Sequence, residues 1–167
     1  PGLEAGMAEA LAEIDRITAN PAPATFENTI AAMERGGRML DRVGTVYGVY
    51  SSTLNDAAVQ AVEREMAPKL AAFGDQITQN EALFKRIAAV YEAREESGLT
   101  PEQKRLVWLQ YTDFVRSGAK LDREAKQQLS AINQKLAGLY TKFGQNVLAD
   151  ENNEQLVIES EADLAGL

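Results

Sequence analysis

The stretch over residues 122–150 constrains the fold most, because it predicts one helix long enough to span the whole molecule. At ~1.5 Å per residue such a helix would be roughly 40 Å long. No proline interrupts the stretch, and Asp122 is the expected N-cap. Its apolar residues recur every three or four positions, which places them on one side of an α-helix in a near-heptad register: Ala125, Leu129, Ile132, Leu136, Leu139, Phe143 and Val147. We expect a core helix of a bundle rather than a free-standing coiled coil.

Helical periodicity upstream predicts further helices, about six in all. The first, over residues 3–19, ends before Pro21 and Pro23. A second, capped by Thr25, is expected to run to position 54 as one long helix with a bend at the pair Gly36 and Gly37. Its glycines are expected to permit close helix packing rather than to bind a ligand.

The next two helices are expected to begin after Asn55 and Asp56, and after Asn80. Pro68 predicts either a kink or a new start within the third helix. The strongest local signal is at residues 100–103, where threonine, proline and glutamine occupy the N-cap, N1 and N3 positions of a capping box. Short connections favour antiparallel neighbours, so the predicted fold is an all-α, mainly antiparallel bundle with one long C-terminal helix.

The pattern changes after position 150. Residues 151–154 predict a polar turn, residues 155–159 favour a short strand, and Ser160 favours the start of another helix. A lone strand has no partner in a helical chain, and the last helix is unfinished. We therefore expect residues 1–150 to be the helical N-terminal domain of a larger protein, and residues 151–167 to be the truncated start of the next segment.

Composition excludes several kinds of chemistry. The sequence contains no histidine and no cysteine, which excludes a histidine general base, thiol catalysis, disulfides and an ordinary zinc site. The net charge of −8 disfavours nucleic acid as a partner. No apolar run approaches the ~20 residues needed to cross a bilayer, so no membrane partner is expected either.

Two sets of polar residues could form sites, but each has an ordinary structural explanation. Carboxylate groups at Glu63 with Glu65, and at Glu92 with Glu95 and Glu96, could hold a hard cation weakly, yet they are also typical of a solvated helix face. The five tyrosines could line a pocket, but at these positions tyrosine usually packs with its hydroxyl at the rim of a core. We therefore assign no catalytic, cofactor-binding or metal-binding residue.

Taken in order, seven stretches resemble the N-terminal helical region of bacterial peptidyl-dipeptidases, also called dipeptidyl carboxypeptidases. These enzymes belong to the zinc metallopeptidase family that includes oligopeptidase A and thimet oligopeptidase. The resemblance covers nearly the whole chain, at residues 23–30, 32–43, 65–70, 80–87, 98–106, 114–121 and 139–148.

The resemblance implies a non-catalytic fragment. The family binds zinc through a His-Glu-x-x-His motif and a downstream glutamate, all beyond the region seen here, so none of these residues can be carried over. Its N-terminal helices form one wall of a deep channel that admits short peptides. The parent enzyme would use zinc-activated water to remove dipeptides from peptide C-termini. The implied partners are the remainder of the parent and short peptides, and the implied compartment is the cytoplasm, with the periplasm as alternative.

Two other classes stay open at this point. A stand-alone helical module for protein–protein interaction predicts a specific partner and no peptidase downstream. A small-ligand-sensing bundle predicts a buried cluster of tyrosine with arginine or glutamate. If a partner domain is missing, an apolar patch should be bare or buried in a homodimer.

Overall fold

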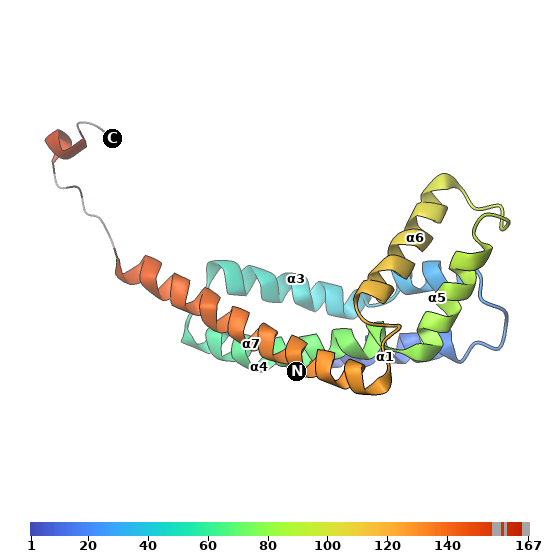
Figure 1. Ribbon diagram of the computed structural model, residues 1–167. Helices are drawn as coiled ribbons and strands as arrows, with labels where there is room; N and C mark the ends of the chain where they lie inside the picture. The colour runs from blue at the N-terminus through green and yellow to red at the C-terminus, as the bar shows by residue number, and fades with distance from the viewer. Residues whose placement is uncertain (155–157, 159, 165–167) are drawn as a thin grey trace.

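The computed structural model describes residues 1–154, 158 and 160–164, and it confirms the all-α fold in these residues (Figure 1). In chain order the elements are α1 (Gly2–Thr18), the π-helical turn η1 (Phe26–Ile30), α2 (Ala31–Arg35), α3 (Arg38–Thr53), α4 (Ala57–Thr78), α5 (Glu81–Ala93), α6 (Pro101–Arg116), α7 (Arg123–Asn153) and the 3-10 turn η2 (Glu161–Leu164). The turn predicted over residues 151–154 is wrong, because α7 continues to Asn153. The strand predicted over residues 155–159 falls almost entirely outside the described residues.

The molecule is elongated, with α3, α4 and α7 lying along its length (Figure 1). The helices α5 and α6 form an antiparallel hairpin at one end, and α7 runs antiparallel to α4. Three helix pairs make most of the contacts: α4 with α7, α1 with α3, and α5 with α6. The expected antiparallel arrangement is therefore confirmed.

The predicted N-caps form as expected, because each depends only on residues three positions apart. Thr100 Oγ1 accepts the N–H of Gln103 at 3.3 Å, and Gln103 Oε1 accepts the N–H of Thr100 at 3.0 Å. Side-chain oxygens also cap η1, α4, α5 and α7, at Thr25, Asp56, Asn80 and Asp122. These contacts fix where the helices begin.

The single helix expected across the glycine pair is wrong, because the chain breaks there. Gly36 is extended and Gly37 adopts a left-handed conformation with φ of 73°. Glu13 Oε2, on α1, accepts the N–H of Gly37 at 2.7 Å and so stabilises the break. Pro68, in contrast, lies inside α4, which continues as one helix.

Two apolar clusters hold the bundle together, and α1 contributes to both. Its first half places Leu3 and Met7 against Met66 of α4, with partly buried residues of α3 around them. Its second half places Ile14 and Ile17 in a larger cluster with residues of η1, α5 and α6. The fully buried members of that cluster are Ile30, Leu83, Ile87 and Val107.

Close packing of α1 on α3 depends on Gly6. A Cβ atom at this position would lie 2.8 Å from Cα of Leu40, which is closer than real side chains come. The sequence predicts such close helix packing at the glycines of the second predicted helix. Gly44 and Gly48 instead have open space where a Cβ would stand, so that interpretation is wrong for these two residues.

The helix α7 packs on α4 through polar side chains. Asn133 Nδ2 donates to Asp75 Oδ1 at 2.7 Å, and Asp75 is only 7% exposed. Nearer the C-terminus of α7, Gln145 Nε2 donates to the carbonyl of Gln60 at 3.0 Å and to Glu63 Oε2 at 2.9 Å. The predicted core position is therefore wrong for five of the seven residues in the apolar stripe of α7, which are exposed, and a seam of hydrogen bonds joins α7 to α4 instead.

The close approach at Gly6 can be tested against a matched glycine. Gly6→Ala should destabilise the protein by roughly 1–2 kcal/mol, because the new methyl group pushes α1 away from α3. Gly44→Ala should instead stabilise it by about 0.5–1 kcal/mol, since alanine favours a helix interior and meets no neighbour. Urea unfolding followed by circular dichroism measures both. Equal effects of the two substitutions would contradict this account of the α1–α3 contact.

The polar seam can be tested with a double-mutant cycle. Asn133→Leu should lower the free energy of unfolding by roughly 2–3 kcal/mol, because it removes the hydrogen-bond donor of a buried carboxylate. Adding Asp75→Leu should recover much of that loss, since no buried polar group is then left alone. Denaturant unfolding of the single and double variants gives the coupling. Strictly additive effects would show that the two side chains do not interact.

Candidate functional site

The side of α7 that the sequence marks as apolar lies on the molecular surface. Phe143 is 68% exposed, and Ile132 and Leu139 are each 54% exposed. We call this surface the α7 apolar face and define it by the exposed residues Ile132, Leu136, Leu139, Tyr140, Phe143 and Val147. The sequence identifies five of these residues correctly but assigns them to the core; Tyr140 joins them only in the structure.

The orientation of α7 follows from its seam with α4. On a helix that turns ~100° per residue, the α7 apolar face is centred roughly a third of a turn from Lys126, Ser130 and Thr141. Lys126 lies on the seam side, 8% exposed, with its Nζ donating to the carbonyl of Gln79 at 3.3 Å. Polar contacts with α4 thus hold α7 in a rotation that turns the apolar stripe away from α4.

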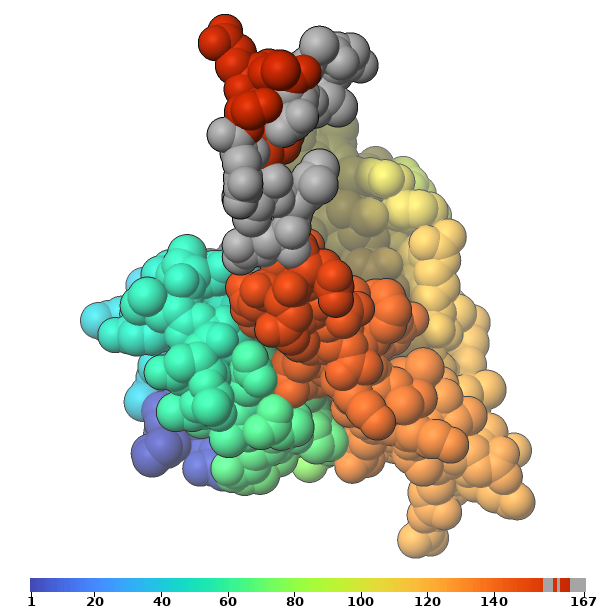
Figure 2. Space-filling model, turned by 90° about the vertical axis from the view of Figure 1, so that its left-hand side faces the viewer, coloured from blue at the N-terminus to red at the C-terminus, as the bar shows by residue number. Residues whose placement is uncertain are grey.

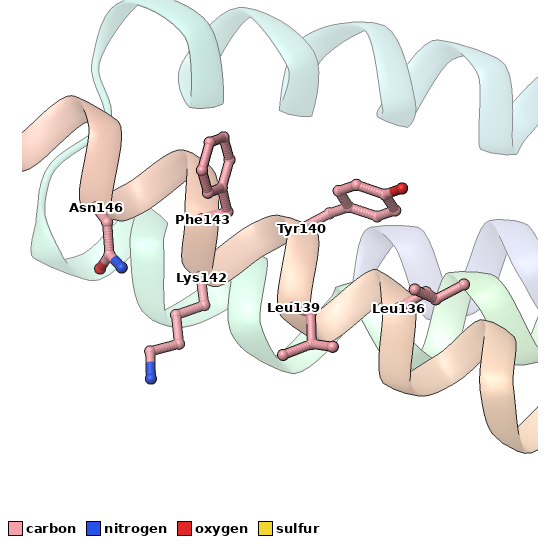
Figure 3. Close-up of a pocket in the computed structure, with 6 residues that line it drawn as sticks. All are labelled: Leu136, Leu139, Tyr140, Lys142, Phe143 and Asn146. Carbon is pink, nitrogen blue, oxygen red and sulfur yellow. The ribbon is translucent and has the colours of Figure 1, made fainter.

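Figure 3 shows how the side chains of this face are arranged. Tyr140 and Phe143 project on the side where α3 lies, whereas Leu139 and Lys142 project on the opposite side. All the residues that line the hollow drawn there belong to α7. A hollow whose walls come from one helix is open surface, so this face suits contact with another element better than enclosure of a small molecule.

A second exposed apolar area lies on α3. Val46, Val49 and Tyr50 are each at least half exposed, and Leu54 at the end of α3 is 60% exposed. Contiguous apolar surface of this kind is typical of interaction sites on folded proteins. The bare apolar surface expected for a chain that lacks a partner is therefore present.

Three of the five candidate carboxylates, Glu63, Glu65 and Glu95, are engaged by ordinary partners. Glu65 forms an ion pair with Lys69 at 2.7 Å, and Glu63 accepts a hydrogen bond from Gln145 in the seam. Lys104 hydrogen bonds to Glu95 at 2.8 Å, and this contact lowers the pKa of the Glu95 carboxyl. Among the described residues, no three aspartate or glutamate side chains gather in a way that could hold a metal ion.

The tyrosines are distributed over several regions rather than around one pocket. Tyr91 and Tyr111 stack with ring centroids 4.0 Å apart, and the Arg94 guanidinium lies 3.9 Å above the Tyr91 ring. This cluster joins α5 to α6 and its rings are in direct contact, so it acts as packing. Tyr47 lies near the second apolar cluster, where burial and then the charge of Glu63 raise the pKa of its hydroxyl. The ligand-sensing alternative gains no support from these residues.

A helix that spans a membrane must be both long and apolar. In the part that the structure describes, no helix combines the length and the apolar character needed to cross a membrane.

Comparison with known proteins shows similarity along the whole chain. It is 35% identical over 167 residues to dipeptidyl carboxypeptidase of Escherichia coli, which covers all of this chain and 24% of that protein. The corresponding protein of Salmonella typhimurium is 34% identical, again over the whole chain. Oligopeptidase A of Escherichia coli is 24% identical over 167 residues. No family model matches the chain.

These relatives are much longer than the chain, which spans about a quarter of their length. The matched part is the N-terminal quarter, in agreement with the resemblance found in the sequence. Along its whole length the chain is thus similar to the N-terminal region of dipeptidyl carboxypeptidase and oligopeptidase A.

Proposed function

We propose that this chain is the non-catalytic N-terminal part of a zinc-dependent peptidyl-dipeptidase, and that it forms one wall of the channel that admits peptides. The observation that carries the proposal is the end-to-end similarity to dipeptidyl carboxypeptidase, at 35% identity over the whole chain. The substrates of the parent are then short peptides, from whose C-termini it releases dipeptides. The proposed compartment is the cytoplasm, with the periplasm as alternative.

The residues of this chain do not fit a zinc site of the kind that the family uses. Such a site needs two histidines one helical turn apart, and the sequence contains no histidine. Two of its candidate carboxylates, Glu65 and Glu95, form ion pairs with Lys69 and Lys104. Any metal chemistry therefore belongs to the rest of the parent, and this chain contributes shape.

The architecture suits a confining role. A channel that selects unstructured peptides by its width needs rigid walls, and long helices packed side by side provide such walls. The helices α4 and α7 contain 22 and 31 residues, and hydrogen bonds join them at both ends of their contact. A wall of this kind selects substrates by excluding folded proteins, without making or breaking a bond itself.

An activity assay tests this division of labour. The purified chain, with or without added zinc, should not cleave peptides, whereas the full-length parent should release C-terminal dipeptides in a zinc-dependent way. A blocked peptide substrate followed by mass spectrometry identifies the products, and the parent stripped of metal by a chelator provides the control.

Two results would contradict the proposal. Peptide cleavage by the chain itself would refute the non-catalytic assignment. A reading frame that stops shortly after position 167 would favour the alternative, a stand-alone module for protein–protein interaction, for which the α7 apolar face would be the natural contact surface.

A further inference from the structure

The α7 apolar face has the geometry of one half of a helix–helix contact. Its residues follow one another in steps of about one helical turn, from Ile132 through Leu136 to Phe143 and Val147. Side chains in this register form the ridge that a second helix accepts between its own side chains. The ridge extends over roughly four turns, which is the length of an ordinary globular helix.

The exposure of this face is energetically unfavourable. Burial of a leucine or phenylalanine side chain contributes about 1.5–3 kcal/mol relative to leaving it in water. In the described part of the chain these side chains stay largely in water, since Phe143 and Tyr140 are 68% and 72% exposed. A surface of this size and pattern favours an apolar partner over solvent.

The relatives indicate where such a partner lies. The chain corresponds to about a quarter of their length, so about three quarters of a related protein lies outside the matched part. The polypeptide leaves this bundle from the C-terminal end of α7, which carries the apolar face (Figures 1 and 2). A following segment therefore starts within a few turns of the ridge and reaches it with little loop entropy.

We propose that an amphipathic helix from the remaining part of the parent peptidase packs along the α7 apolar face, with Phe143 and Leu136 as its central contacts. The inference rests on the proposed function, because it takes the parent to be the longer peptidase. The polar seam then has a complementary role: it attaches α7 to α4 while leaving the apolar side free for this second helix.

Hydroxyl-radical footprinting tests the contact. The isolated chain, at a concentration where light scattering shows a monomer, is compared with the full-length parent. Oxidation of Phe143, Leu136 and Leu139 should be several-fold slower in the parent. Lys135, which is exposed on α7 and does not line the hollow, should keep the same reactivity toward an acylating reagent in both samples. Equal oxidation of Phe143 in the two samples would overturn the proposal.

A matched pair of variants gives a second test. Phe143→Gln should lower the Tm of the parent but leave the Tm of the isolated chain unchanged, because the Phe143 side chain is 68% exposed there. Lys135→Gln, at an exposed position of α7 that does not line the hollow, should leave both values unchanged. A parent whose Tm is insensitive to Phe143→Gln would contradict the inference.

The same samples separate this inference from the proposed function. A parent that cleaves peptides but leaves Phe143 as reactive as in the isolated chain would refute the contact alone. A parent that protects Phe143 but has no peptidase activity would support the contact and refute the proposed function.

Discussion

The hydrogen-bonded seam between α4 and α7 determines which side of α7 faces the solvent. Buried polar groups require particular partners at particular positions, whereas apolar side chains tolerate many arrangements. Asn133 and Gln145 therefore fix both the register and the rotation of α7 on α4. The apolar ridge is exposed as a consequence of this rotation, because α7 cannot pack its polar side and its apolar side on α4 at the same time.

The sequence predicts local features of this fold well. Helix periodicity and the caps at Thr100 and Asp122 depend on neighbours within one turn, so they can be read directly from spacing. The break at Gly37 could not be predicted, because it is stabilised by Glu13, which lies 24 positions away in the sequence. The same limit applies to Gly6, whose importance depends on the backbone of Leu40.

The candidate site was predicted in part. The apolar spacing on α7 identifies the residues of the ridge, since periodicity shows which side of a helix is apolar. It does not show whether the element that covers this side belongs to the same stretch of chain. The polar residues at positions 133, 141 and 145 form a second stripe on α7, and this was the available sign that two different sides of the helix could serve as contacts.

The sharing of α1 between the two apolar clusters has a consequence for cooperativity. Two separate cores in one chain would ordinarily melt one after the other, each with its own midpoint. Here α1 contributes residues to both cores. Unfolding of one core exposes one half of α1 to solvent, while the other half of α1 still packs in the second core. The two ends of the bundle are therefore thermodynamically linked, and α1 makes a molecule with two cores behave as a single folding unit.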